Sequence, residues 1–284
     1  MNTSVECKKP NVACCAIMKN EGPYLVEWVA YYTALGFEKI YIYENDSTDD
    51  TPEILKQLHA CGAIEYIPWP SLDKKSPQLS AYEDAISRTK SDWILFCDTD
   101  EFLVLKKHSC VTDFIRDFGI DVSCISINWR IFGSSGNEKK TLGLVTERFS
   151  KCSAEKFVSN HHVKSFVRPK DVKEMHIHAP ETNGKSVYPD GTLLSFKDDR
   201  RGLSSEIKID TAVINHYFTK TREEWTIKKA RGNANRALDA KDKFERYQFE
   251  VYDSYDRNEE IDTSISKHMQ KTKEIIKELE GLKG

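Results

Sequence analysis

The sequence predicts an α/β fold in which a mainly parallel sheet is flanked by helices. Short apolar runs alternate with helix-like stretches over about the first 130 residues, the order that right-handed β–α–β crossovers produce. The run DWILFC at 92–97 is apolar on both faces, as a central parallel strand is. Polar clusters follow three of the runs: KNEG at 19–22, ENDSTDD at 44–50 and DTDE at 98–101. Ligands bind beyond the carboxyl ends of such strands, so the three clusters predict one shared site.

The first strands and the first helix follow from local patterns. Runs rich in apolar and aromatic residues predict strands at 11–18 (NVACCAIM), 39–45 (KIYIYEN) and 63–69 (AIEYIPW). A helix that ends at Gly36 is predicted by apolar residues at helical spacing. These residues are Leu25, Trp28, Val29, Tyr32 and Leu35.

Two more helices complete this part of the chain. Thr51 is the expected N-cap of a helix whose first residue is Pro52 and which ends at Gly62. Another helix is expected over residues 78–89, before the strand at 92–97.

After about residue 120 the alternation is less regular. Strands are expected at 124–132 and 211–218, a Gly/Ser-rich loop at 133–143, and antiparallel strands with long loops around 161–184. Thr221 and Glu224 form a possible capping box at the start of a helix. The last 25 residues predict a charged helix with a sparse apolar stripe that docks on the body. We therefore expect a domain over 1–235 and a C-terminal helical extension over 236–284.

Composition excludes several classes of protein. With 42 basic and 45 acidic residues the chain has a net charge of −3, which argues against a general nucleic-acid binder. No apolar run approaches the roughly 18 residues of a transmembrane segment, and the polar N-terminus lacks the core of a signal peptide. The eight cysteines form no CxxC pair and suit reduced, buried positions. These features predict a cytoplasmic protein, free or peripheral to a membrane.

Asp98 and Asp100 stand two residues apart directly after the strand at 92–97. Packed acids repel one another unless a cation lies between them, and carboxylate oxygens suit Mg²⁺ or Mn²⁺. The alternative is a turn whose acids only face water. The convergence of three polar clusters favours the metal.

Several stretches together resemble a glycosyltransferase of the GT-A fold, close to the family-2-like group and to family 92. They occur in the family's order, cover roughly residues 12–235, and include KNEG, WILFCDTDEF, NWRIFGSSG, HVKSFVRP, HIHAP and INHYFTKTREEW. The resemblance implies transfer of a sugar, with inversion, from a nucleotide diphosphate sugar (a UDP-sugar first) to a hydroxyl of a glycan or glycoconjugate. It also implies Mn²⁺ or Mg²⁺ as cofactor.

The resemblance also implies roles for particular residues. The nucleotide would contact Asn20, Glu21, Glu44, Asn45, Asp46 and Gln78, and the nucleotide-bound ion would contact Asp98. Family-2 enzymes usually carry Asp-Asp-Gly-Ser where this chain has Glu44-Asn45-Asp46-Ser47. The acids that follow, Asp49 and Asp50, are interpreted as residues that favour a helix N-terminus.

His216 in INHYF occupies the position from which the GT-A fold often returns a histidine to the ion, so the predicted metal ligands are Asp98, Asp100 and His216. The diphosphate needs compensating charge, and Lys164 and Lys229 are assigned to it from a set of basic candidates that also contains Arg168, Lys228 and Arg231. The run KKARG could instead be a solvated helix face. His176 and His178 could bind metal or simply point into a polar cleft.

An inverting enzyme needs a general base for the acceptor hydroxyl. Glu147, in TERF after the Gly/Ser-rich loop, is the predicted base, with Asp190 and Glu101 as alternatives; Glu147 could equally begin a helix. Trp129 is expected to offer a flat face to the acceptor sugar. Two other functions remain open: a nucleotidyltransferase, whose Gly/Arg/Lys-rich loop is missing from AIMKNEG, and a non-catalytic sugar-nucleotide-binding module.

Overall fold

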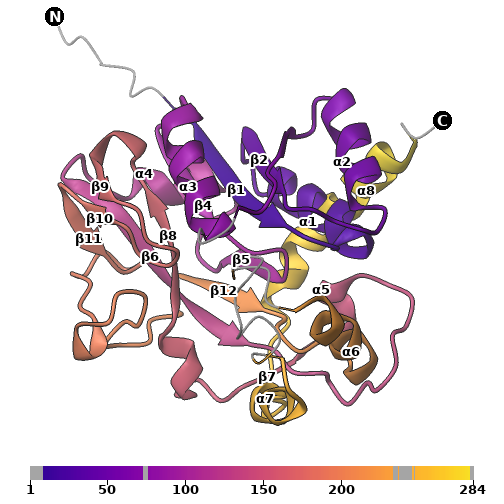
Figure 1. Cartoon of the computed structure of the whole chain (residues 1–284). Coiled ribbons are helices and arrows are strands. Elements are labelled where there is room, and N and C mark those ends of the chain that lie inside the picture. The colour runs from indigo at the N-terminus through magenta and orange to yellow at the C-terminus, as the bar shows by residue number, and fades with distance from the viewer. Residues whose placement is uncertain (1–8, 73–75, 233–235, 237–244, 246, 282–284) are drawn as a thin grey trace, which may run out of the picture.

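The structure, a computed structural model, describes residues 9–72, 76–232, 236, 245 and 247–281. Its main sheet has the strand order β3-β2-β1-β4-β8-β6-β12-β5, with β11 paired to β6 (Figure 1). Five pairings are parallel (β1 with β2, β1 with β4, β2 with β3, β6 with β11, β6 with β12) and three antiparallel. The predicted fold class is therefore confirmed: a mixed, mainly parallel sheet flanked by helices, with a C-terminal helix.

The main-sheet strands are β1 (Val12–Met18), β2 (Lys39–Glu44), β3 (Glu65–Pro68), β4 (Trp93–Phe96), β5 (Glu101–Leu105), β6 (Val122–Ile131), β8 (Val163–Val167), β11 (Lys185–Val187) and β12 (Ala212–His216). Two small pairs join β7 (Lys151–Cys152) to β13 (Glu260–Ile261) and β9 (Val172–Glu174) to β10 (Glu181–Thr182). The helices are α1 (Gly22–Ala34), α2 (Thr51–Ala60), α3 (Pro77–Arg88), α4 (Val111–Arg116), α5 (Val145–Arg148), α6 (Arg222–Arg231), α7 (Phe249–Tyr255) and α8 (Met269–Gly281).

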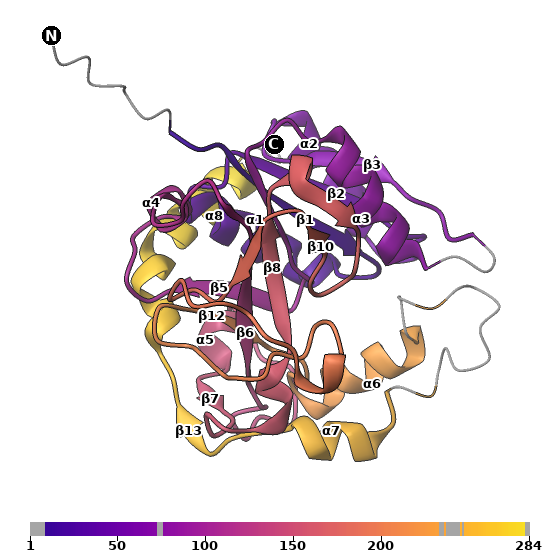
Figure 2. The same ribbon diagram turned by 90° about the vertical axis from the view of Figure 1, so that its left-hand side faces the viewer.

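Strand β1 divides the core into two apolar layers. Cys14 and Ala16 pack into the layer that contains α1, α2 and α8, whereas Ala13 and Cys15 pack into the layer that contains α3. Successive side chains of a strand point to opposite faces, so an unbroken apolar run supplies both layers at once. The helices therefore cover both faces of this part of the sheet (Figure 2).

The first helix matches its prediction, and the second differs in how it begins. In α1 the expected apolar face is buried, and Gly36 follows with a φ of 90°, a value that favours glycine. In α2 the N-cap is Asp50, whose side chain makes no cap hydrogen bond, so the prediction that Thr51 caps this helix is wrong. The Thr51 hydroxyl instead accepts a hydrogen bond of 2.9 Å from the backbone N–H of Glu21, which ties α2 to the turn after β1.

The run WILFCDTDEF contains two strands. Strand β4 ends at Phe96, the chain turns through Asp98 to Asp100, and β5 begins at Glu101. Strand β5 then pairs antiparallel with β12, with Glu101 opposite His216. The acids thus occupy a turn between two buried strands, and the backbone N–H of Tyr217 donates to the carbonyl of Asp100 at 2.8 Å.

The expected capping box at the start of α6 is present. The Thr221 hydroxyl accepts from the backbone N–H of Glu224 at 3.1 Å, and the Glu224 carboxylate accepts from the backbone N–H of Thr221 at 3.2 Å. The same carboxylate receives both terminal nitrogens of Arg148, at 3.1 and 2.7 Å, and the hydroxyl of Tyr24 at 2.8 Å. Burial raises the pKa of Glu224, but these hydrogen bonds outweigh it and hold the pKa at about 2.

The change Glu224→Gln is expected to lower the free energy of unfolding at pH 7 by about 3 kcal/mol, because a fall in pKa from the usual 4.5 to about 2 corresponds to that stabilisation of the charged form. This contribution is complete above pH 4.5 and is lost as the pH falls through 2. Urea denaturation should therefore give a difference in the free energy of unfolding between variant and wild type that is about 1.4 kcal/mol smaller at pH 3.5 than at pH 7. A difference that does not change with pH would contradict the assignment.

The C-terminal helix lies beside the first helix of the chain (Figures 1 and 2). Met269 and Leu279 of α8 belong to the same buried layer as α1, and the ring of His268 lies 6.0 Å from that of Tyr31. Within the expected apolar stripe Ile265 is buried, but Ile261 lies in β13 and is 73% exposed. The boundary between 235 and 236 stays a prediction.

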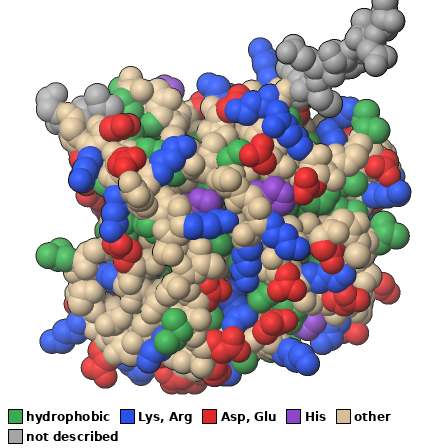
Figure 3. All heavy atoms as spheres, turned by 180° about the vertical axis from the view of Figure 1, so that it is seen from behind, with side chains coloured by type: hydrophobic (Ala, Val, Ile, Leu, Met, Phe, Trp, Pro, Cys, Tyr) green, Lys and Arg blue, Asp and Glu red, His purple; other side chains and the backbone are tan. Residues whose placement is uncertain are grey.

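Charges are distributed as the composition suggests, but the thiols are not all buried, since Cys61 is exposed and Cys110 is half-buried. Acidic and basic side chains are interspersed over the back of the molecule (Figure 3). The cysteines in the described part of the chain are free thiols. Across the same residues, the helices are all too short or too polar to cross a membrane.

Candidate active site

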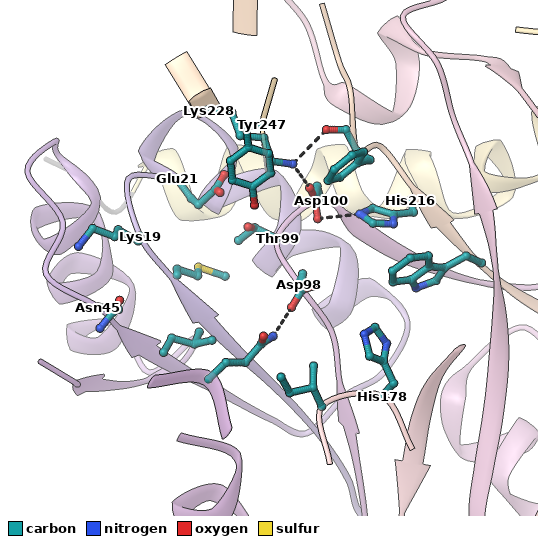
Figure 4. A pocket seen from close by; sticks show the side chains of 16 residues that line it. Lys19, Glu21, Asn45, Asp98, Thr99, Asp100, His178, His216, Lys228 and Tyr247 are labelled. Carbon is teal, nitrogen blue, oxygen red and sulfur yellow. Dashed lines mark hydrogen bonds and ion pairs between the residues drawn. The ribbon is translucent and has the colours of Figure 1, made fainter. Parts of the chain in front are cut away.

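A cavity lies where the three polar clusters meet (Figure 4). Strand β1 leads to Lys19 and Glu21, β2 leads to Asn45, and β4 leads to Asp98 and Asp100. Because β1, β2 and β4 are parallel neighbours, their carboxyl ends share one edge of the sheet. The opposite wall comes from β6 and from segments that follow it in the chain. Its lining residues include Trp129, His178, His216, Phe218 and Lys228.

Asn20 joins the first two clusters to each other. Its backbone N–H donates to the hydroxyl of Ser47 at 3.0 Å, and its side-chain carbonyl accepts from the N–H of Thr48 at 2.7 Å. Its φ of 52° is uncommon for a residue with a side chain, although Asn adopts it more readily than most. Asn20 does not line the main cavity, whereas its neighbour Glu21 does.

In the second cluster only Asn45 lines the cavity. Its amide nitrogen donates to the carbonyl of Trp69 and to the hydroxyl of Ser71, both at 2.9 Å. The carboxylates of Glu44 and Asp46 accept hydrogen bonds from the backbone N–H groups of Ser47 and Ser71. Glu44 and Asp46 therefore shape the loop that presents Asn45.

Asp98 is held by three side chains. Gln78 donates to one carboxylate oxygen at 2.7 Å, and the ammonium group of Lys164 lies 3.0 Å from the other. Lys164 also lies 3.5 Å from Glu101, whose carboxylate accepts from the backbone N–H of Asp98 at 2.8 Å. Burial raises the pKa of Asp98, but Lys164 outweighs it and lowers that pKa. Burial and the two aspartates raise the pKa of Glu101.

Lys164 is fully buried and does not line the cavity. Strand β8 pairs antiparallel with β4, which carries Lys164 past the end of β4 to the buried side of Asp98. The prediction that Lys164 compensates a bound diphosphate is therefore not supported by its position. Its charge is used to compensate Asp98 and Glu101.

The carboxylate of Asp100 has two partners, one ammonium group and one imidazole. Lys228 of α6 lies 2.8 Å from one carboxylate oxygen, and Nε2 of His216 lies 3.3 Å from the other. Burial opposes ionisation, but Lys228 and His216 hold the pKa of Asp100 well below its usual range. Burial lowers the pKa of His216, which keeps the imidazole neutral.

Two ionised carboxylates and a neutral imidazole are donors that Mn²⁺ or Mg²⁺ can accept, the nitrogen favouring Mn²⁺. Nδ1 of His216 is buried and has no hydrogen-bond partner in the described structure, so no protein contact on that side fixes which ring nitrogen carries the proton. Within the described residues, however, no three His, Cys, Asp or Glu side chains are grouped closely enough to hold an ion. The residue types fit a divalent cation, and a cation on Asp100 would compete with Lys228 for that carboxylate.

Of the two adjacent lysines of α6, Lys228 and not Lys229 reaches the cavity. The ammonium group of Lys229 lies 5.0 Å from the ring centre of Phe249 in α7. One residue changes direction by about 100° around a helix, so only one of the pair can face the site. The position of Lys229 therefore does not support its predicted role at the nucleotide, and Lys228, the neighbouring candidate, is the one that faces the cavity.

None of the carboxylates predicted as general base lies at the cavity. Glu147 is the third residue of α5, is 44% exposed in its side chain, and lies 2.5 Å from Lys273 of α8. Glu101 is buried against Lys164, and Asp190 pairs with Lys208 at 3.0 Å in a distant loop. Glu147 is accordingly not carried forward as the base.

The change Glu147→Gln is expected to leave turnover within about twofold of wild type, since an exposed ion pair contributes little and touches no cavity residue. Steady-state kinetics with saturating donor would check this. A fall of about 100-fold, the usual range for a lost general base, would restore Glu147 to the mechanism.

Aromatic and histidine side chains form the wall opposite the nucleotide clusters. Trp129 lines the cavity, but one face of its ring is already stacked on His162, with ring centres 4.7 Å apart. His178 also lines the cavity, whereas His176 is half-exposed beside Glu174. The spacing of two residues predicted one strand face for both histidines, and this prediction is wrong because residues 175–180 form no strand, so only His178 faces the cavity.

Comparisons with known proteins agree on one family. A model of glycosyltransferase family 92 matches residues 9–278. A glycosyltransferase family 92 protein of Ricinus communis is 30% identical over 135 residues, which is 45% of this chain and 24% of that protein. One from Oryza sativa subsp. japonica is 26% identical over 167 residues, 57% of this chain and 27% of that protein. The chain thus spans about a quarter of the length of the curated relatives it matches.

Two solved structures illustrate the likeness to known folds. The structure of S. aureus TarS 1–349 has a TM-score of 0.38 and 13% identity, and covers 56% of this chain and 47% of that one. Glucosyl-3-phosphoglycerate synthase of Mycobacterium tuberculosis, solved with Mg²⁺ and uridine diphosphate, has a TM-score of 0.35 and 13% identity and covers 57% of both chains.

Proposed function

The chain belongs to glycosyltransferase family 92, and from this premise we propose that it transfers a sugar from a nucleotide diphosphate sugar to a hydroxyl of a glycan or glycoconjugate. The observation that carries the proposal is the pair of ionised carboxylates, Asp98 and Asp100, facing a cavity at the carboxyl ends of three parallel strands. Metal use, inversion and the donor class, a UDP-sugar first, are parts of the same proposal.

The donor would lie across the strand ends. The nucleoside would contact the wall formed by Glu21 and Asn45, whose carboxylate and amide can pair with ribose hydroxyls or a base edge. The diphosphate would then reach Asp98 and Asp100, which line the same cavity. Gln78, which lines the cavity and donates to Asp98, would contact the nucleotide beside that carboxylate.

Asp98, Asp100 and His216 would hold Mn²⁺ or Mg²⁺ against the diphosphate, where the bound ion would act as a Lewis acid on the leaving group. Lys228 would supply a second positive charge. Its ammonium group now lies 2.8 Å from Asp100 and 3.0 Å from the carbonyl of Phe218, and it would turn to the diphosphate once Asp100 binds elsewhere. A lysine tolerates this exchange because its ammonium is a point charge on a flexible stem.

The acceptor would enter from the wall formed by Trp129 and His178. A hydroxyl on that side attacks the anomeric carbon opposite the diphosphate, so a single displacement inverts the configuration. The new C–O bond forms as the bond to the diphosphate breaks, the electron pair leaves on the nucleoside diphosphate, and the proton of the attacking hydroxyl is released to solvent.

A panel of nucleotide sugars, incubated with aryl glycosides with and without Mn²⁺, tests the proposal. We expect Mn²⁺-dependent release of nucleoside diphosphate together with a glycosylated product of inverted configuration at the transferred sugar. Release of pyrophosphate from nucleoside triphosphates would instead indicate a nucleotidyltransferase. Tight donor binding without turnover, measured by calorimetry, would indicate a binding module.

A further inference from the structure

His178 is the histidine of the cavity wall that is not engaged by a carboxylate. Its Nδ1 lies 2.9 Å from the backbone carbonyl of Val163. A carbonyl can only accept, so Nδ1 carries the ring proton and the lone pair of the neutral ring is at Nε2. Burial, and after it Lys164, lowers the pKa of His178 to about 3, so the ring is neutral at physiological pH. Nε2 has no hydrogen-bond partner among the described residues, and the ring lines the cavity.

The position of His178 is fixed from several sides, although it lies outside any strand. The Ser165 hydroxyl donates to its backbone carbonyl at 2.8 Å. Gly202, with a φ of 93°, approaches so closely that a Cβ there would lie 2.7 Å from the Cβ of His178. The backbone carbonyl of Gly202 in turn accepts from the N–H of Val163 at 3.1 Å, so the three segments form one unit. A loop side chain held in this way is preorganised for a ligand.

The place of His178 in the cavity assigns it to the acceptor. Asn45 and Lys19 lie on one side of Asp98, and His178 lies on the other (Figure 4). A donor with its nucleoside at Asn45 and its diphosphate at Asp98 therefore carries its sugar toward His178. Trp129, whose ring centre is 5.5 Å from that of His178, borders the same space.

We propose that Nε2 of His178 accepts the hydrogen bond of the attacking acceptor hydroxyl and orients that oxygen toward the anomeric carbon. This inference rests on the proposed function and makes His178 a residue that touches substrate. The hydroxyl must donate, which selects acceptors with a free hydroxyl at this point over those that are methylated there. Histidine at 178 thus contributes to acceptor use and not to donor binding.

Two substitutions separate this role from a structural one. In His178→Asn the amide nitrogen can take the place of Nδ1 and keep the hydrogen bond to Val163, but no atom replaces Nε2. In His178→Gln the amide oxygen can take the place of Nε2, but the bond to Val163 is lost. Transfer from a UDP-sugar to aryl glycosides gives the turnover and the acceptor KM, and calorimetric titration of UDP with Mn²⁺ gives the donor-site affinity.

We expect His178→Asn to lower kcat/KM for the acceptor by about 100-fold, as expected when a reacting group loses its orientation, with UDP affinity within about twofold of wild type. His178→Gln should keep at least about a tenth of wild-type transfer. Gly202→Ala, which must displace the histidine, should lower transfer in the same way as His178→Asn. His176→Ala, a histidine two residues away and outside the cavity, is the matched control and should match wild type.

The opposite order, with activity kept in His178→Asn and lost in His178→Gln, would overturn the proposal and make the histidine structural. An equal loss of UDP affinity in His178→Asn would overturn it as well, because it would assign the ring to the donor. Absence of transfer by the wild type with every donor and acceptor would overturn the proposed function itself, and this inference with it.

Discussion

Replacing Asp100 by Asn is expected to reduce sugar transfer to below about one thousandth of wild type, the upper range for loss of one preorganised charge at a reaction centre. The carboxylate is nearly buried, is ionised because Lys228 and His216 face it, and stands in the turn between β4 and β5. Asparagine has nearly the same shape, and the N–H of Tyr217 donates to the backbone carbonyl of residue 100, so that hydrogen bond should persist in the variant. Asp98→Asn should have a comparable effect, since Lys164 would then face only Glu101.

Donor turnover and the melting temperature, measured on the same preparations, test whether the acid pair acts in catalysis or in folding. Asp84→Asn is the matched control, because Asp84 is also ionised and paired, with Arg88 at 2.9 Å, but lies on α3 outside the cavity. Retained transfer in folded Asp100→Asn protein would remove the acid pair from the mechanism. A large fall in melting temperature with proportionate activity in the folded fraction would make the pair structural.

His216→Ala is expected to weaken Mn²⁺ binding in the presence of a nucleoside diphosphate by at least about tenfold, or roughly 1.4 kcal/mol. The imidazole is neutral, and its Nε2, which lies 3.3 Å from Asp100, can bind a metal once the ring proton moves to Nδ1. Since nitrogen ligands favour Mn²⁺ over Mg²⁺, the variant should also lose part of any preference between the two ions. Calorimetric titration of each ion into nucleotide-saturated protein gives both quantities.

The pH dependence supplies an independent check on His216. Protonation removes the lone pair of the imidazole, so the affinity of the wild type for Mn²⁺ should fall as the pH is lowered. Because burial lowers the pKa of His216, this fall should begin below pH 6.5, the usual pKa of histidine. His59→Ala, a change at a histidine of α2 that makes only local backbone contacts, serves as control. Equal Mn²⁺ affinities in His216→Ala and wild type would take His216 out of the site.

The sequence predicted the meeting of the polar clusters because one rule of parallel sheets produces it. When β1, β2 and β4 run parallel, whatever follows each of them arrives at the same edge. Hydrophobic runs define those strands, so Lys19, Asn45 and Asp98 could be expected together without any knowledge of side-chain direction. The position of His216 beside the acids followed only from the family resemblance.

Side-chain direction in the second half of the chain could not be predicted in the same way. Which of Lys228 and Lys229 faces the site depends on how α6 is rotated about its axis. That rotation is set by the contacts of Thr221, Glu224 and Arg148. Lys164 lies beneath the acids because β8 pairs antiparallel with β4, a register that its own composition does not encode. Glu147 lies away from the cavity because α5 packs beside the C-terminal segment, far along the chain.

The docking of α8 on α1 has a consequence for the order of events during biosynthesis. The face of α1 that carries Tyr31 waits for a partner that is translated roughly 240 residues later, which takes about 12 to 50 seconds at ordinary elongation rates. Until then the parallel strands can pair, but one apolar layer stays open and is a target for chaperones and for aggregation. Nascent chains arrested before residue 269 should consequently be more sensitive to protease within α1 than chains that include α8, because α8 covers the apolar face of α1.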